Sequence, residues 1–294
     1  MTRQHKATLY GLSAVLLWST VATAFKLTLR YLSPIELLLF AGAFSTLLLG
    51  VILLLQGKLR LALQCSRREY LLSIGLGLLS PFLYYLVLLN AYARLPAQQA
   101  QPLNYTWAIT LSLLAVPLLK QKIYWQQWLA LLISYCGVVI IATEGDPFSL
   151  QFTDPFGVAL ALGSTILWAL YWIYNTRDRR DPVVGLFVNF ICGFPFVLGY
   201  YLLTAEIQLP PLPGLLGAIY IGTFEMGACF VLWLLALKLT DNTAKISNLI
   251  FISPFLSLVL IYFLLGEEIL PSTFVGLVLI VAGLICQGLK RTAK

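Results

Sequence analysis

The sequence predicts an all-α integral membrane protein with ten transmembrane helices, built as two inverted five-helix repeats with both termini in the cytoplasm. Of its 294 residues, 60% are hydrophobic and 11% are charged, whereas a soluble domain has about 25% charged residues. The apolar residues gather in runs of about 20, the length that spans a bilayer as a helix. The two halves of the chain also resemble one another, which predicts the repeat.

Ten apolar runs follow one another, separated by short polar gaps that hold most of the charges. The fourth run has the most polar start of the ten. We place the expected spans at residues 7–25, 35–55, 70–90, 97–119, 125–143, 156–174, 183–203, 212–237, 244–265 and 271–289.

The distribution of lysine and arginine predicts the orientation, because cytoplasmic loops carry an excess of these residues. With both termini cytoplasmic, sixteen of the nineteen fall inside, and only Lys26, Arg30 and Arg94 fall outside. An odd number of spans would spoil this alternation. We therefore expect a multi-pass protein of a bacterial cytoplasmic (inner) membrane.

Short matches recur between the halves at a nearly constant offset of about 145–150 residues. They pair Gly11 and Leu17-Trp18 with Gly157 and Leu167-Trp168, Ser33-Pro34 with Asp181-Pro182, Leu89-Asn90-Ala91 with Leu234-Leu235-Ala236, and Gly137-Val138-Val139-Ile140 with Gly283-Leu284-Ile285. Each half holds five spans, so the second half enters the membrane inverted, with a central site expected at the repeat interface. The predicted repeats are residues 1–146 and 147–294 of one integrated membrane domain.

These features resemble the EamA type of the drug/metabolite transporter superfamily over the whole chain. The resemblance rests on the five-plus-five spans, the prolines that open the second and seventh spans, and Gly266-Glu267 followed by Gly276 and Gly283. The first half departs from the family pattern, since Gln121-Lys122 stands where a Gly-Glu pair often follows the fourth span. We therefore interpret Glu267 as a local structural residue rather than half of a symmetric functional pair.

Within this superfamily, two short motifs resemble the aromatic amino acid exporters. They are Asn104-Tyr105-Thr106-Trp107 in the fourth span and Trp168-Ala169 in the sixth. The resemblance implies a central cavity lined by aromatic side chains.

The fourth span carries polar side chains that lipid does not tolerate, because an unsatisfied amide there costs several kcal/mol. At 100° per residue, Gln101, Asn104 and Tyr105 share one broad face. Two interpretations stay open: hydrogen bonding between helices and substrate binding. Trp107 lies about 100° from the centre of this face, so it reaches the same cavity only if Pro102 kinks the helix.

Aromatic residues in two other spans complete the predicted binding site. Trp168 lies near mid-depth, too deep for an interfacial aromatic belt, and we expect it to line the cavity, although packing is the alternative. Tyr84 and Tyr85 are neighbours and point about 100° apart on a helix. One of them is expected to face the interior and the other to pack.

Glu225 is the only carboxylate near the centre of any expected span. A charged side chain there costs roughly 2.5–3.5 kcal/mol on insertion scales. Proton coupling and a hydrogen-bonded packing role are both open for it. Pro81 and Pro254, inside the third and ninth spans, each free a carbonyl one turn earlier and are candidate gating positions together with Pro102.

The predicted function is a secondary transporter that exports small amphipathic metabolites by alternating access through a cavity lined by aromatic and amide groups. Resemblance makes aromatic and other neutral amino acids the expected substrates. The chain has no Walker A motif, so we expect no ATP-binding domain and no cofactor. The lone His5 and five scattered cysteines offer no catalytic pair or metal site, and no basic stripe indicates nucleic acid.

Other functions remain as alternatives. A nucleotide-sugar carrier, or another metabolite or drug carrier of the superfamily, would need cationic residues at mid-depth to bind phosphate groups. An intramembrane enzyme would need a nucleophile and a base. A channel would need a charged ring or a filter-like loop.

Overall fold

A computed structural model describes residues 2–119, 125–148, 154–175, 178–239 and 248–288. Within these residues every regular element is a helix, which confirms the predicted all-α class. Six helices are long and apolar enough to cross a membrane by length and composition: Arg3–Thr28, Pro34–Leu55, Arg67–Arg94, Pro155–Asn175, Pro182–Thr204 and Leu212–Trp233. Shorter apolar helices cover Leu131–Ala142, Ser253–Leu265 and Pro271–Gly283.

The first half of the chain folds into α1 (Arg3–Thr28), α2 (Pro34–Leu55), α3 (Leu59–Leu63), α4 (Arg67–Gly77), η1 (Leu78–Leu83), α5 (Tyr84–Arg94), α6 (Ala97–Tyr105), α7 (Trp107–Leu119) and α8 (Trp125–Ala142). Local sequence sets several helix starts. Ser33 with Glu36 and Ser66 with Glu69 form capping boxes at α2 and α4, which satisfy backbone N–H groups that have no partner within the helix.

The second half folds into α9 (Pro155–Asn175), α10 (Pro182–Thr204), α11 (Leu212–Tyr220), η2 (Ile221–Ala228), α12 (Cys229–Leu239), η3 (Asn248–Ile252), α14 (Ser253–Leu260), η4 (Ile261–Leu265) and α15 (Pro271–Gly288). Prolines open α9 and α10, where a missing N–H costs no hydrogen bond. Asp181 caps α10 by accepting from the Val183 and Val184 amides.

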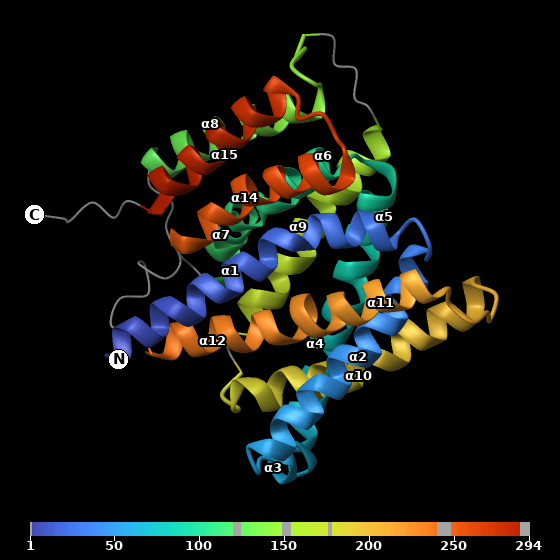
Figure 1. Cartoon of the computed structure of the whole chain (residues 1–294). Coiled ribbons are helices and arrows are strands. Elements are labelled where there is room, and N and C mark those ends of the chain that lie inside the picture. The colour runs from blue at the N-terminus through green and yellow to red at the C-terminus, as the bar shows by residue number, and fades with distance from the viewer. Residues whose placement is uncertain (1, 120–124, 149–153, 176–177, 240–247, 289–294) are drawn as a thin grey trace, which may run out of the picture.

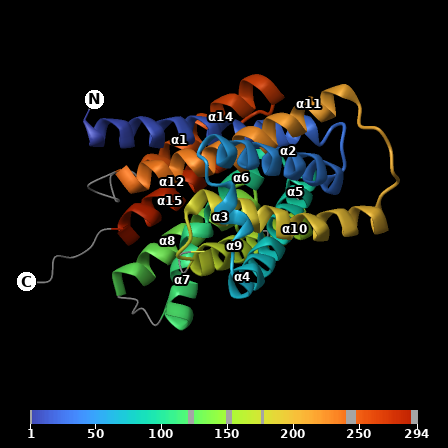
Figure 2. The same cartoon turned by 90° about the horizontal axis from the view of Figure 1, so that it is seen from below.

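Helices from the two halves pack against each other throughout the bundle (Figure 1). The α8 and α15 helices lie side by side, α1 packs along α12, and α2 packs along α10. The start of α1 and the end of α15 lie at the same end of the bundle in both views (Figure 2).

Several expected spans are interrupted. In the third, Ser80 is extended (φ −150°, ψ 124°), which separates α4 from α5 just before Pro81, inside the wide π-helical turn η1. The eighth contains a second wide π-helical turn, η2, which includes Glu225. Wide turns of this kind are rare in proteins, and those that occur often lie at functional sites.

The fourth span is interrupted at Thr106 rather than at Pro102, the expected position of the kink. α6 runs through Pro102 to Tyr105. The Thr106 amide then donates to the Leu103 carbonyl (3.2 Å), and the Thr106 hydroxyl donates to the same carbonyl (2.7 Å). The tight i→i+3 backbone turn at Thr106 marks the end of α6, and α7 begins at Trp107.

Pro254 lies in the first turn of α14, where its lack of an N–H costs little. The tight turn η3 precedes it and α14 starts at Ser253, so Pro254 stands where one helix type passes into the other within the ninth span.

Candidate functional site

Six aromatic side chains from three helices form a buried group, which we call the aromatic cluster. Trp168 stacks between Tyr84 (ring centroids 4.3 Å, interplanar angle 22°) and Tyr171 (5.5 Å, 16°). Tyr85 meets Tyr84 edge-on at 4.8 Å. The members are Tyr84, Tyr85, Trp168, Tyr171, Trp172 and Phe230, of which Trp172 alone is not fully buried.

Helical spacing explains the contribution of α9 to the aromatic cluster. Trp168, Tyr171 and Trp172 stand at positions i, i+3 and i+4, so they share one face. Trp172 stacks on Phe230 of α12 at 6.4 Å and 16°. The sequence therefore predicts these neighbours within one helix, but not the ring of α12 that covers them.

Tyr84 and Tyr85 both belong to the aromatic cluster, and both are buried. Their exposed fractions are 4% and 1%. The reason is that α5 packs against α9, α2, α1 and α6. With protein on several sides, two side chains that point 100° apart are both buried.

Asn104 connects the fourth span to the aromatic cluster. Its amide nitrogen donates to Ser164 Oγ at 3.0 Å, and its oxygen accepts from the Tyr84 hydroxyl at 3.5 Å. Tyr105 points elsewhere: its hydroxyl donates to Ser253 Oγ of α14 at 2.7 Å, and Ser19 of α1 donates to the same oxygen at 3.3 Å.

The predicted polar face of the fourth span is thus divided between two directions. Gln101 is 3% exposed. Its Oε1 has no hydrogen-bond partner among the described residues. Asn104 contacts α9, whereas Tyr105 contacts α14.

Glu225 reaches the aromatic cluster from η2. It is 8% exposed, and its Oε1 accepts from the Tyr85 hydroxyl at 3.2 Å. The indole of Trp18 lies in interaction range of the same carboxyl. The wide turn around Glu225 crosses α2 closely: a Cβ at Gly222 would collide with the Ala41 carbonyl.

The remaining predicted residues lie outside the aromatic cluster. Trp107 is half-buried at the start of α7 and packs at the edge of the core. None of the ring contacts found among the described residues joins it to the aromatic cluster. Pro81 and Pro102 are buried beside helix interruptions.

Sequence reasoning missed a buried ionic cluster at the connection between α9 and α10. Arg180 Nη2 donates to Asp178 Oδ2 (2.6 Å) and to Ser73 Oγ of α4 (2.8 Å), and Ser73 donates to Asn189 Oδ1 of α10 (2.7 Å). The side chains of Arg180 and Asp178 are only 6% and 8% exposed. Burial opposes the charged guanidinium, but the bonds to Asp178 outweigh it and raise the pKa of Arg180. In the sequence, the charged run Arg177–Asp181 has the composition of an ordinary loop, so no sequence signal indicates the burial of Asp178 and Arg180.

Gln98 and Glu267 organise the opposite end of the fourth span. The Glu267 carboxylate accepts from the Ala97 and Gln98 amides (3.0 and 3.2 Å) at the start of α6. The Gln98 side chain in turn accepts from the Leu270 amide and the Thr273 hydroxyl. A carboxylate at a helix N-terminus is stabilising, which agrees with the interpretation of Glu267 as a structural residue.

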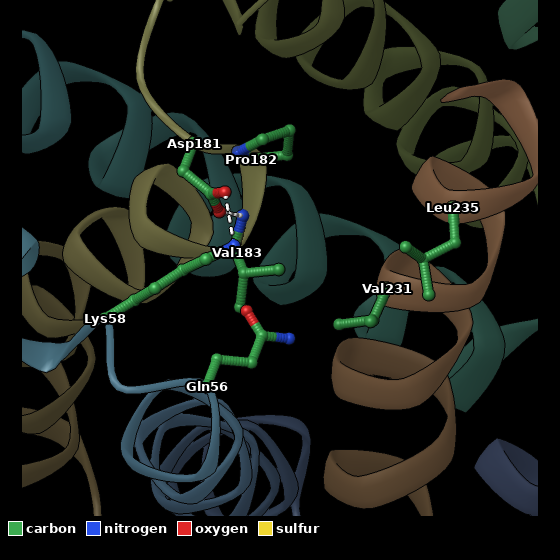
Figure 3. A pocket seen from close by; sticks show the side chains of 7 residues that line it. All are labelled: Gln56, Lys58, Asp181, Pro182, Val183, Val231 and Leu235. Atoms are coloured by element: carbon green, nitrogen blue, oxygen red, sulfur yellow. Dashed lines mark hydrogen bonds and ion pairs between the residues drawn. The ribbon is translucent and has the colours of Figure 1, made fainter. Parts of the chain in front are cut away.

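A small surface pocket lies near the same α9–α10 connection (Figure 3). Figure 3 shows the ion pair of Lys58 with Asp181 (2.8 Å) facing Val231 and Leu235 of α12. Partial burial of Asp181 favours its neutral form, but Lys58 and the capped amides outweigh this and lower its pKa. None of the predicted site residues lines this pocket.

Comparison with known proteins places this geometry in a family. A family model described as "EamA-like transporter family" matches residues 5–143 and again residues 155–288. The "Uncharacterized transporter YvbV" of Bacillus subtilis is 24% identical over 286 residues, which cover 95% of this chain and 90% of that protein.

Two further relatives have a named substrate class. The "Aromatic amino acid exporter YddG" of Salmonella typhimurium is 27% identical over 299 residues, and that of Escherichia coli is 26% identical over 302 residues. Each alignment covers 97% of this chain and 98% of the relative. A solved structure described only as "Crystal structure of protein" has a TM-score of 0.69 over 96% of both chains at 21% identity, which indicates a shared fold. The chain therefore belongs to the EamA-like transporter family of the drug/metabolite transporter superfamily and is a multi-pass integral membrane transporter.

Proposed function

We propose that this transporter exports aromatic and other neutral amino acids, with the aromatic cluster as its central binding site. The observation that carries this proposal is the stack of Tyr84, Trp168 and Tyr171, with polar groups bound to its edges. Asn104 bonds to Tyr84, and Glu225 bonds to Tyr85. Stacked rings accommodate an aromatic side chain, since offset stacking contributes about 0.5–1.5 kcal/mol beyond burial.

Polar groups beside the rings suit an amphipathic substrate. Gln101 Oε1 and Glu225 Oε2 are buried acceptors with no hydrogen-bond partner among the described residues. A buried acceptor without a partner is costly, and a polar group of a bound substrate would supply a donor. The names of the two exporters that align over nearly the whole chain support the same substrate class.

We infer the inverted-repeat architecture from two independent features. The family model matches once in each half. The start of α1 and the end of α15 lie at one end of the bundle, as an even number of spans requires. These features support ten spans in the repeats 1–146 and 147–294, with the charge bias placing both termini in the cytoplasm.

Alternating access requires elements that bend, and the interrupted helices are the candidates. Pro81 follows the extended Ser80 between α4 and α5, Pro102 precedes the interruption at Thr106, and Pro254 starts α14 after a tight turn. Each interruption lies close to a binding residue: Tyr84, Asn104 and Tyr105 respectively. Bending at these points would separate the stacked rings and open the site to one side of the membrane.

The test is transport by purified protein in proteoliposomes with a panel of labelled amino acids, sugars and nucleotide sugars. Trp168→Ala should reduce the preference for tryptophan over leucine about three- to tenfold, because it removes the central ring of the stack. Trp125→Ala is the matched control, since Trp125 is 68% exposed on α8. Wild-type protein that moves no amino acid would overturn the proposal, and unchanged selectivity in Trp168→Ala would remove the aromatic cluster from the binding site.

A further inference from the structure

The aromatic cluster ends, on the side of the α9–α10 connection, in a group of buried hydrogen-bond donors. Tyr171 terminates the ring stack and is 1% exposed. Its hydroxyl lies beside the Asn189 side chain and within electrostatic range of Asp178 and Arg180. Tyr171 belongs to α9, Asn189 to α10, and Asp178 and Arg180 to the connection between these helices. The fold brings their side chains together at one place.

Two of these donors have no acceptor. Asn189 Oδ1 accepts hydrogen bonds from Ser73 and Arg180. The Nδ2 atom of the same amide therefore points away from these two donors. Asn189 Nδ2 and Tyr171 Oη lie near one another but outside hydrogen-bond geometry, and neither has another partner among the described residues. Asn189 is 0% exposed, so the polar nitrogen is shielded from water as well. Buried donors without acceptors cost roughly 1–3 kcal/mol each.

Arg180 adds a charge to the same group and already binds a carboxylate there. Its Nε and Nη2 atoms hold both oxygens of Asp178 at 2.6–2.9 Å. The partners are only two residues apart in one connection, so their bond does not by itself join two helices. Removing such a pair from water costs several kcal/mol per ion, and the sequence around it would allow both charges to lie on the surface.

We propose that Tyr171, Asn189 and Arg180 form a carboxylate-binding site for the transported amino acid. The α-carboxylate displaces Asp178 from Arg180 and accepts from the Tyr171 hydroxyl and the Asn189 amide. The released Asp178 pairs with the α-ammonium, and the aromatic side chain stacks on Tyr171. One internal ion pair is thereby replaced by two, so no charge is left unpaired.

This site rests on the proposed amino acid export and gives it a direction. With both termini cytoplasmic, the α9–α10 connection lies on the cytoplasmic side, where an exported substrate binds first. The site also defines a substrate class more narrowly: an aromatic compound with a free carboxylate. Amines without a carboxylate would gain only the ring contacts.

The experiment measures binding of labelled L-tryptophan to the purified full-length protein, with unlabelled L-tryptophan, indole-3-propionate and tryptamine as competitors. Tyr171→Phe keeps the ring and removes only the hydroxyl. It should weaken L-tryptophan and indole-3-propionate about tenfold, the effect of losing one hydrogen bond to a charged group. Tryptamine, which has no carboxylate, should change less than twofold. Tyr201→Phe is the control, since Tyr201 is also buried on α10 and its hydroxyl donates to the Glu206 carbonyl far from this site.

A second variant gives an effect of opposite sign. Asp178→Asn removes the competing carboxylate, so indole-3-propionate should bind more tightly to it than to wild type. The carboxylate site would be overturned if Tyr171→Phe weakened the binding of all three ligands equally or weakened none of them. It would also be overturned if indole-3-propionate bound more weakly to Asp178→Asn than to wild type. A wild-type protein that binds no amino acid would overturn the proposed function as well, whereas wild-type binding with an unaffected Tyr171→Phe overturns the carboxylate site alone.

Discussion

The crossing of α4 with α10 should depend on the absence of a side chain at Gly77. A Cβ placed there would collide with the Asn189 carbonyl and lie 2.6 Å and 2.8 Å from the amide nitrogen and Cα of Gly193. All three neighbours are backbone atoms of α10, so no side-chain rotation relieves the overlap. Gly77→Ala must move the helices apart, and overpacking of this kind costs about 1–3 kcal/mol.

Gly75, two residues earlier on α4, provides a matched control. It is exposed, and a Cβ there meets no atom within 4 Å. Because alanine favours the helix over glycine by about 0.8–1.0 kcal/mol, Gly75→Ala should stabilise the protein slightly. Gly77 is also a helical residue of α4, so Gly77→Ala gains the same propensity, and the two alanine variants should differ by the overpacking cost, about 1–3 kcal/mol in the free energy of unfolding.

The assay compares thermal denaturation of wild type, Gly75→Ala and Gly77→Ala in one detergent. Gly77→Ala should denature at the lowest temperature and Gly75→Ala at or above the wild-type temperature. Gly77→Ala should also disturb the hydrogen bond between Ser73 and Asn189, because both residues lie within about a turn of the crossing. If Gly77→Ala is as stable as Gly75→Ala, the close backbone contact between α4 and α10 does not exist.

Three further substitutions test other contacts. Glu267→Gln should cost about 0.3–2 kcal/mol in thermal stability, because it removes the negative charge at the start of α6. Glu268→Gln should cost nothing comparable, since Glu268 contacts Gln98 through its backbone carbonyl. Equal losses in the two variants would refute the role of Glu267 as the cap of α6. The lowered pKa of Asp181 means that its ion pair stabilises the protein at neutral pH and that this contribution is lost as the pH falls through the lowered value. Asp181→Asn should thus be less stable than wild type at pH 7, by under about 1 kcal/mol for a partly exposed pair. The difference should shrink as the pH falls below about 4, the ordinary aspartate pKa, and vanish below the lowered pKa of Asp181; a constant difference in pH-dependent melting would contradict this. Glu225→Gln should slow transport and remove its pH dependence if Glu225 carries the coupling proton, and wild-type rates with an unchanged pH profile would exclude that role.

Much of the general plan is readable from the sequence because membrane insertion depends on the length and polarity of continuous segments. The apolar runs predict the helices, and the isolated Glu225 and the polar residues of the fourth span stand out against them. Trp168 could be placed in the interior for the same reason. These features need no knowledge of which helices are neighbours.

The partners of these residues depend on tertiary contacts that no local pattern encodes. The helical wheel alone predicts that Tyr84 and Tyr85 point in different directions. Both are nevertheless buried, because α5 has protein on several sides. The fourth span is interrupted at Thr106, where the backbone forms a tight turn, although Pro102 is the stronger breaker in sequence.

Arg180 illustrates the limit most clearly. In the sequence it is one charge in a polar connection, and in the structure it is buried against Asp178, Ser73 and Asn189 from three segments of the chain. The sequence by itself determined a helical membrane transporter with a polar, aromatic interior, since hydrophobic length and composition are properties of the chain. The tertiary structure alone decided which rings stack, which donors lack acceptors and which charges leave water, because those depend on atoms brought together from distant positions.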